Sequence, residues 1–145
     1  MIQSVGTDMY ISDSNAVFPV VEHFISINGE GRRAGQLALF IRFAGCNLKC
    51  GYCDTGWANE KDVPYESFKA DLIIETIVSS GIKNVTLTGG EPLMRPEIKN
   101  LLEYMRTMRN IRVEVETNGS VDIEQFFPEK NDFMEDNVTF TVDYK

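Results

Sequence analysis

L-A-L-F-I-R-F-A-G-C-N-L-K-C-G-Y-C, residues 37–53, leads a predicted strand directly into the only cysteines of the chain. The first part, Leu37–Phe43, is aliphatic and aromatic around a single arginine, which is typical of a strand. The loop that follows carries Cys46, Cys50 and Cys53. Three thiols cannot all pair as disulfides, and a chain with no other cysteine has little use for a disulfide scaffold. The loop therefore indicates a metal or cluster site.

Three interpretations of these cysteines remain open on the residues alone. Three thiolates on a short loop can hold three irons of a [4Fe–4S] cluster and leave the fourth iron free for chemistry. Zinc also binds thiolates, but a closed structural zinc site needs a fourth ligand, and the only histidine, His23, lies well upstream in an apolar-aromatic stretch typical of an ordinary core or surface histidine. Buried structural cysteines are the third interpretation, although this close spacing is rarely accidental.

Length and composition predict one soluble domain over residues 1–145, in which residues 1–23 form an N-terminal extension. The chain is 43% hydrophobic and 25% charged, which is enough to build a core. No apolar run approaches the roughly 20 residues that span a bilayer, and the first residues do not resemble a signal peptide. The net charge of −8 argues against direct nucleic-acid binding. Reduced thiols without a targeting segment predict a cytoplasmic protein.

Beyond the cysteine loop, predicted strands alternate with predicted helices. Three more strands are expected at Val85–Thr88, Arg112–Glu116 and Val138–Val142. Helical spacing of apolar residues predicts one helix over Tyr65–Ser80 and another from Pro96 onward. Gly81 is expected to end the first helix. Asn28–Gly35 is predicted to be an exposed loop, and Asp122–Phe127 a helical turn.

This alternation predicts an α/β fold with a parallel sheet and right-handed crossovers. In such sheets reactive groups gather at the carboxyl ends of the strands. Each predicted strand ends in a polar cluster: the cysteine loop, Thr88–Pro92, Glu116–Gly119 and Asp143–Lys145. We therefore expect all four clusters to meet at one edge.

The glycine-rich cluster has two interpretations. Gly89 and Gly90 would let the backbone approach a ligand closely, and Glu91 could accept hydrogen bonds from an ammonium group. G-G-E-P is equally well explained as a turn ahead of a helix.

The remaining polar residues also have competing interpretations. Glu116 and Asn118 could bind sugar hydroxyls, although Asn-Gly is also a common turn. Asp54 and Thr55 offer oxygens suited to Mg²⁺, or they form a helix N-cap. Arg42 would be costly to bury without an anionic partner, and an internal carboxylate is the commoner partner.

The pattern C-x-x-x-C-x-aromatic-C, here Cys46, Cys50, Tyr52 and Cys53, resembles the signature of the radical S-adenosylmethionine (SAM) superfamily. The resemblance implies a partial (β/α) barrel and a [4Fe–4S] cluster whose free iron is chelated by SAM. One-electron reduction then cleaves SAM to a 5′-deoxyadenosyl radical that abstracts hydrogen from the substrate, while the protein orients the reactants and excludes water and oxygen. The SAM contacts implied by the resemblance are Tyr52, Cys53 and Asp54 near adenine, Gly89, Gly90 and Glu91 at the methionine ammonium, and Glu116 and Asn118 at the ribose.

Four motifs in order resemble, more narrowly, the 7-carboxy-7-deazaguanine synthase family: F-I-S-I-N-G-E-G-R-R-A-G (24–35), F-I-R-F-A-G-C-N-L-K-C-G-Y-C-D-T (40–55), L-T-G-G-E-P-L (87–93) and V-E-T-N-G (115–119). These lyases contract the ring of 6-carboxy-5,6,7,8-tetrahydropterin on the route to deazapurines such as queuosine. The resemblance implies that the substrate is contacted by Ile27, Asn28, Gly29, Arg42 and Thr88. Arg42 would bind the substrate carboxylate. The resemblance also implies that Thr55 ligates Mg²⁺ and that Lys145 contacts SAM. An electron donor such as flavodoxin or ferredoxin and a homodimer are expected.

The sequence departs from the family where Asn28 replaces the usual Gln and Asp143-Tyr144 replaces the commoner Ser-Pro before Lys145. A glycyl-radical activating enzyme is the alternative, but such enzymes typically carry D-G-P-G where this chain has N-G-E-G. A non-catalytic zinc or electron-transfer module is the third hypothesis.

Because the sequence stops just after the predicted strand Val138–Val142, we expect a barrel truncated after about four strands, or a partner chain that covers this edge.

Overall fold

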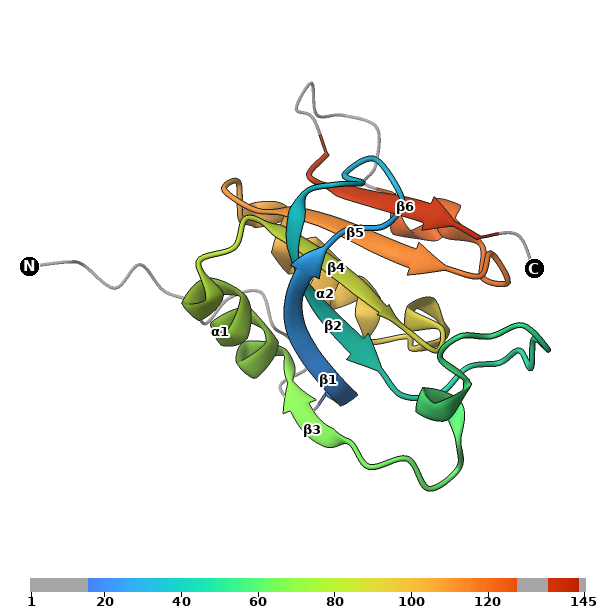
Figure 1. The fold of residues 1–145 in the computed structure, drawn as a ribbon. Coiled ribbons are helices and arrows are strands. Elements are labelled where there is room, and N and C mark those ends of the chain that lie inside the picture. Colours follow the sequence, from blue (N-terminus) through green and yellow to red (C-terminus); the bar gives the residue numbers. More distant parts are fainter. Residues whose placement is uncertain (1–15, 128–135, 144–145) are drawn as a thin grey trace, which may run out of the picture.

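The computed structural model describes residues 16–127 and 136–143. Its centre is a six-stranded sheet with α1 (Ala70–Ser80) and α2 (Ile98–Thr107) packed against it (Figure 1). The strands are β1 (Val17–Ile27), β2 (Leu37–Phe43), β3 (Glu66–Lys69), β4 (Asn84–Gly89), β5 (Arg112–Thr117) and β6 (Val138–Val142). Short 3₁₀ turns follow β2, β4 and β5, namely η1 (Gly56–Asn59), η2 (Pro92–Met94) and η3 (Ile123–Phe126).

The strand order is β3-β1-β2-β4-β5-β6, and β2, β4, β5 and β6 are mutually parallel. These are the four strands expected from the sequence, so the α/β class and the parallel core of the sheet are confirmed. Register pairs Arg42 with Thr88 and Thr86 with Glu114. The carboxyl ends of the four strands consequently meet at one edge, on the right in Figure 1.

Two strands were not predicted, so the sheet is mixed rather than purely parallel. β1 runs antiparallel to β2 and to β3, and it includes residues 17–23 of the segment expected to be an N-terminal extension. The helix predicted from Tyr65 begins only at Ala70, because residues 66–69 pair with β1 instead. Phe68 fits both a helical and an alternating pattern, and pairing of residues 66–69 with β1 satisfies backbone groups of both segments. The expectation of about four strands is therefore corrected to six within the described residues.

One face of the sheet forms the core with the helices. Alternate strand residues point to opposite faces, and the apolar ones point toward α1 and α2. The buried contacts join Val20, Leu39, Ile41, Phe43, Val85, Leu87, Val113 and Val115 of the strands to Ile73, Ile77, Ile98, Leu101, Leu102 and Met105 of the helices. Each such side chain contributes about 1.5–3 kcal/mol when fully buried. Gly81 ends α1 in the left-handed conformation, as predicted.

The opposite face of the sheet is polar. In β5, the alternation R-V-E-V-E-T sends the valines to the helices and places Glu114 and Glu116 on the other side. The loop between β1 and β2 folds across this face: a side chain at Gly31, whose φ is +76°, would overlap the Glu114 carboxyl. Asn28, predicted to be in an exposed loop, is buried because of this fold-back, whereas most of the loop after it is exposed as expected.

Among the described residues, neither helix is long and apolar enough to cross a membrane. β6 lies at the end of the sheet, so one side of this strand has no neighbouring strand within the described residues.

Candidate functional site

The cysteine loop begins where β2 ends, at the carboxyl edge of the sheet. All three cysteines are free thiols; Cys46 and Cys50 are partly buried and Cys53 is exposed. A turn brings the N–H of Cys53 to 3.2 Å from the carbonyl oxygen of Cys50, and the N–H of Leu48 donates to the Sγ of Cys46 at 3.4 Å.

The cysteine loop was expected to hold either a [4Fe–4S] cluster or a zinc ion. Within the described ranges, no three His, Cys, Asp or Glu side chains, the three cysteines included, are gathered in a metal-binding arrangement. His23 is on β1 against Phe68, with ring centroids 5.9 Å apart, and supplies no fourth ligand to the loop. The loop supplies three thiols, the number that a [4Fe–4S] cluster with one open iron needs, whereas a structural zinc site needs four ligands.

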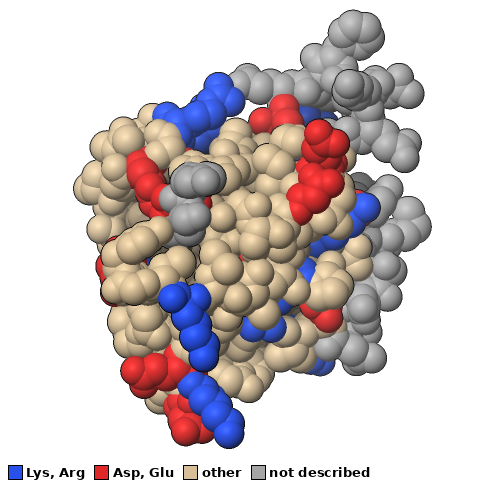
Figure 2. Space-filling view, turned by 90° about the vertical axis from the view of Figure 1, so that its right-hand side faces the viewer, with Lys and Arg blue, Asp and Glu red and all other residues tan. Residues whose placement is uncertain are grey.

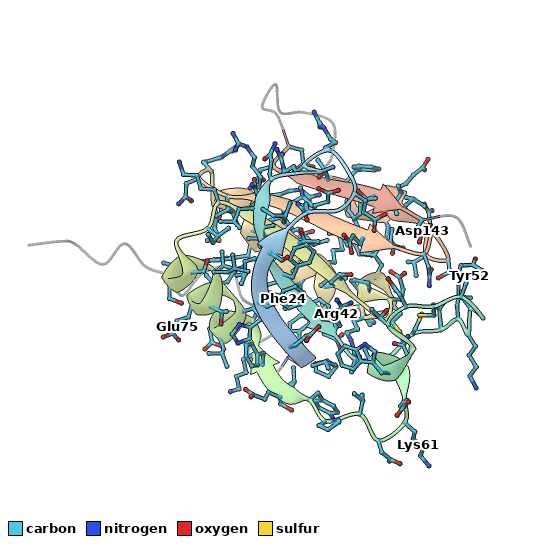
Figure 3. All side chains as sticks on the ribbon, viewed as in Figure 1. Phe24, Arg42, Tyr52, Lys61, Glu75 and Asp143 are labelled. Atoms are coloured by element: carbon cyan, nitrogen blue, oxygen red, sulfur yellow. The ribbon has the colours of Figure 1, made fainter. Side chains whose placement is uncertain are left out.

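The edge that carries this loop has few charges at its centre. Figure 2 shows an uncharged surface with lysine, arginine and acidic side chains mainly around the periphery. Tyr52 extends from the loop with 68% of its surface exposed, and Asp143 lies at the same edge just after β6, while Arg42 lies further back along the sheet (Figure 3). The segments that follow β2 and β6, two of the four predicted polar clusters, therefore lie at the same edge.

Gly89 and Gly90 are needed for close contact between strands. Gly89 has a φ of +134°, and a side chain there would overlap the backbone of Phe43. A side chain on Gly90 would overlap the carbonyl oxygen of Gly45, and the N–H of Gly90 already donates to the Phe43 carbonyl at 3.0 Å. The close approach that we predicted for a ligand is made here by the start of the cysteine loop. Contact of these glycines with SAM stays a prediction.

Glu91 is completely buried and is surrounded by donors from its own chain. Its Oε1 accepts from the N–H of Leu93 at 2.9 Å and from the hydroxyl of Thr117 at 2.8 Å, and its Oε2 accepts from the N–H of Asn118 at 2.7 Å. The carboxylate thus ties the end of β4 to the end of β5. Contact between Glu91 and the methionine ammonium of SAM stays a prediction. Both carboxylate oxygens already accept hydrogen bonds from the chain itself.

Asn118 connects the end of β5 to the cysteine loop. Its Nδ2 lies 3.6 Å from the Sγ of Cys46 and 3.1 Å from the Oδ1 of Asn47. The Nδ2 of Asn47 in turn donates to the hydroxyl of Ser120 at 2.8 Å. Asn47 and Ser120 were not predicted: Asn47 lies inside the cysteine motif, and Ser120 directly follows V-E-T-N-G.

Arg42 has the internal carboxylate partner that its position in an apolar strand predicted. Its Nε donates to Oε1 of Glu22 on β1 at 2.8 Å. The guanidinium carbon also lies 6.0 Å from the ring centroids of both Phe24 and Trp57, a cation–π geometry. The arginine is therefore in contact with one carboxylate and near two aromatic rings.

Glu116 and Thr88 lie beside Arg42 on the same face. Burial is the largest influence on the Glu116 carboxyl and raises its pKa; nearby Glu30 and Glu114 raise it further. A hydrogen bond with the Thr88 side chain and the charge of Arg42 lower it. Glu116 was predicted as a SAM contact and Thr88 as a substrate contact. In the structure the two are neighbours, and together with Arg42 they form one row of polar side chains across the sheet.

A second polar row lies closer to the start of the strands. The Oδ1 of Asn28 accepts from the hydroxyl of Thr86 at 2.8 Å, while its buried Nδ2 finds no hydrogen-bond partner among residues 16–127 and 136–143. Glu114 accepts from the hydroxyl of Thr141, and its buried Oε2 likewise has no partner in these ranges. Two residues that the sequence analysis missed, Thr86 and Glu114, could have been found from strand alternation, because each lies two residues before a predicted site residue.

The other predicted residues are placed as follows. Ile27 is an odd number of positions from Phe24, so its side chain points to the face opposite Arg42, and Gly29 is open to solvent. Thr55 precedes η1, but its side chain makes no capping hydrogen bond; its hydroxyl lies 3.7 Å from the Sγ of Cys53. Asp54 is exposed. Lys145 lies outside the described residues.

Comparison with known proteins gives a consistent result. The family description "Radical SAM superfamily" matches residues 40–142. The 7-carboxy-7-deazaguanine synthase of Clostridium acetobutylicum is 55% identical over 128 residues, covering 88% of this chain and 56% of that protein. The synthase of Haemophilus influenzae is 40% identical, covering 70% of this chain and 46% of its own length. The chain thus spans about half the length of the curated relatives it matches.

A solved structure is similar in fold. The crystal structure of QueE from Escherichia coli superimposes with a TM-score of 0.70 over 89% of this chain and 60% of that chain, at 23% sequence identity. The fold that this chain shares with that structure therefore covers most of the chain.

Proposed function

The chain belongs to the radical SAM superfamily, and we propose that it acts as a 7-carboxy-7-deazaguanine synthase. The proposed reaction converts 6-carboxy-5,6,7,8-tetrahydropterin to 7-carboxy-7-deazaguanine, with SAM as the radical source. The shared name of the relatives in Clostridium acetobutylicum and Haemophilus influenzae supports the proposal. The same substrate and reaction are implied by the four motifs.

The observation that carries the proposal is the row formed by Arg42, Thr88 and Glu116 behind the cysteine loop. A carboxylated pterin needs a cation for its carboxylate, hydrogen-bonding groups for its ring edge and an apolar surface for its ring face. Arg42 offers the cation: Glu22 occupies its Nε, and a guanidinium has further N–H groups that can bind a carboxylate. Phe24 and Trp57 supply aromatic surface near the guanidinium.

The chain's own residues would orient the reactants. Cys46, Cys50 and Cys53 would hold the [4Fe–4S] cluster, which with bound SAM supplies a 5′-deoxyadenosyl radical for hydrogen abstraction. Thr88 and Glu116 would hydrogen-bond the ligand beside Arg42. Because the pKa of Glu116 is raised, this carboxyl retains a proton to higher pH than an exposed one and can then donate to a ligand oxygen.

A magnesium ion would bind at Thr55. Its hydroxyl is not used for capping and lies 3.7 Å from the Sγ of Cys53, next to the proposed cluster. Asp54 is adjacent and exposed, and hydroxyl and carboxylate oxygens are the donors Mg²⁺ prefers. We also propose that a flavodoxin or ferredoxin supplies the electron, that the protein is a cytoplasmic homodimer, and that Gly89, Gly90, Asn118 and Lys145 contact SAM.

The test is anaerobic reconstitution of the chain with iron and sulfide, followed by incubation with SAM, dithionite and the carboxypterin. We expect iron and sulfide to bind and 7-carboxy-7-deazaguanine to accumulate, as measured by mass spectrometry. Cys50→Ala is the matched control and should bind almost no iron, because two thiolates cannot hold the cluster. About one zinc and no iron per chain would remove the radical-enzyme proposal. SAM cleavage without the deazaguanine product would contradict the synthase and favour an activating enzyme.

A further inference from the structure

We propose that Asn118 is a positioning residue for the cluster, whose side-chain amide donates a hydrogen bond to the Cys46 sulfur and raises the reduction potential of the iron–sulfur centre bound there. The inference depends on the cluster that the radical SAM superfamily implies. It does not depend on the pterin substrate.

The orientation of the Asn118 amide is determined by its neighbours. Its Oδ1 accepts from the backbone N–H of Ser120 at 2.9 Å, so its nitrogen faces the other way. That nitrogen lies 3.6 Å from the Sγ of Cys46 and 3.1 Å from the Oδ1 of Asn47. Because Asn47 directs its own nitrogen to the Ser120 hydroxyl, its oxygen must face Asn118. Each polar atom in this set therefore has one consistent assignment.

A buried carboxylate fixes the position of Asn118. The backbone N–H of Asn118 donates to the Oε2 of Glu91 at 2.7 Å, and the side chain of the preceding residue, Thr117, donates to Oε1. Glu91 is fully buried, and charge-assisted hydrogen bonds of this kind are among the strongest in proteins. The amide therefore approaches Cys46 from a rigid part of the sheet edge rather than from a free loop.

The three thiols differ in their donors. Cys46 receives two N–H groups, one from Leu48 at 3.4 Å and one from Asn118. Cys53 lies near only the Thr55 hydroxyl, and no donor to Cys50 is found within the described part of the chain. N–H groups beside a ligand sulfur stabilise added negative charge, and hydrogen bonds to the sulfurs are among the factors that set the reduction potential of such clusters. Cys46 is therefore the ligand through which the protein favours reduction most strongly.

The proposal is tested by a potentiometric titration with dithionite of the reconstituted chain without SAM, followed by electron paramagnetic resonance. SAM is omitted so that any contact of Asn118 with the ribose cannot contribute. Asn118→Leu has a similar shape but no donor, and we expect a lower midpoint potential than in the parent chain. Iron release to a chelator should also be faster, by roughly 10-fold, the lower end of effects seen for residues that support metal ligands.

Ser120→Ala is the matched control from the same loop. It removes the hydrogen bond from Asn47 but leaves the backbone N–H that orients Asn118, so its midpoint should equal that of the parent. Asn118→Gln keeps an amide donor and should lie closer to the parent than Asn118→Leu.

An unchanged midpoint in Asn118→Leu would overturn the proposal, as would an equal shift in Ser120→Ala. If Asn118→Leu binds no iron but keeps the parent's circular dichroism, iron binding by Asn118→Gln would support the donor role, and equal loss in both variants would overturn it. None of these outcomes depends on product formation, so they are separate from the test of the synthase.

Discussion

The Oε2 of Glu91 accepts the backbone N–H of Asn118 at 2.7 Å, which joins the carboxyl ends of β4 and β5 through a side chain with no exposed surface. The two residues lie 27 positions apart in sequence and belong to different motifs. Through Asn118 the connection continues to Cys46 at the start of the cysteine loop. The ends of three parallel strands, β2, β4 and β5, are thereby held together by one buried carboxylate.

Removal of this carboxylate should destabilise the protein strongly. Glu91→Ala leaves buried donors from Leu93, Thr117 and Asn118 without an acceptor. We expect the free energy of unfolding to fall by about 2–4 kcal/mol, since unsatisfied buried donors and lost bonds to a charged group each cost on this scale. Urea denaturation of the cluster-free protein measures the change. Glu103→Ala, on the exposed side of α2, should change it by less than about 0.5 kcal/mol. Equal effects of the two substitutions would contradict the assigned role of Glu91.

Gly90 should tolerate no side chain. A Cβ at this position would overlap the carbonyl oxygen of Gly45, and backbone on both sides must move to relieve the overlap. Gly90→Ala should therefore lower the free energy of unfolding by about 1–3 kcal/mol, the usual cost of overpacking. The control is Gly51→Ala in the cysteine loop, where a Cβ would meet nothing within 4 Å. Thermal unfolding of the two variants, compared with the parent, checks the difference; a normal melting temperature for Gly90→Ala would show that the strand ends can separate at little cost.

Glu116 should make stability depend on pH in a specific direction. Its pKa in the folded chain is raised, mainly by burial, so the folded state binds the proton more tightly than the unfolded state. The contribution of Glu116 to stability is therefore largest below the unfolded pKa, which is near 4.5, and is lost as pH rises through the raised folded value. Glu116→Gln removes this dependence, so the variant should gain stability relative to the parent as pH increases from about 4 to 8.

Urea denaturation at several pH values tests the prediction for Glu116. Glu75→Gln on the exposed side of α1 (Figure 3) should follow the parent at every pH. A constant difference between Glu116→Gln and the parent across this range would mean that the Glu116 carboxyl has an ordinary pKa.

Thr55→Val should weaken the response to magnesium more than the cleavage of SAM. Valine keeps the branched shape but removes the oxygen that we propose as a ligand, while Thr55 makes no capping bond whose loss would disturb η1. The measurement is product formation and SAM cleavage against Mg²⁺ concentration, with the midpoint of the product curve expected at higher Mg²⁺ in the variant. Thr76→Val on α1, far along the chain from the loop, is the control. Superimposable metal titrations of Thr55→Val and the parent would make Thr55 a structural residue only.

The strands β2, β4, β5 and β6 could be predicted because their signals are local. Runs such as L-A-L-F-I-R-F and V-T-F-T-V are followed directly by loops, and their alternation with helical periodicity implies parallel order. The close spacing of Cys46, Cys50 and Cys53 is likewise a local pattern. The superfamily could be inferred before any coordinates for this reason.

β1 and β3 were missed because their signals are weaker. Val17–Ile27 contains a proline, a glutamate and a histidine, and its register shifts between Val20 and Glu22, which interrupts the alternation. Residues 66–69 merge into a helical pattern and become a strand only because β1 offers an unpaired edge. Such pairing is a property of two distant segments rather than of either one.

Composition and motif spacing were sufficient to indicate the α/β class, the thiol-bearing loop and the polar groups at the strand ends, because each is written in neighbouring residues. They did not indicate that Arg42 pairs with Glu22, that Glu91 is buried between strands, or that Asn28 turns inward onto Thr86. Those contacts join residues that lie far apart along the chain. Whether a charged side chain meets a ligand, a partner or another part of the backbone depends on the packing around it, which arises only when the sheet has assembled.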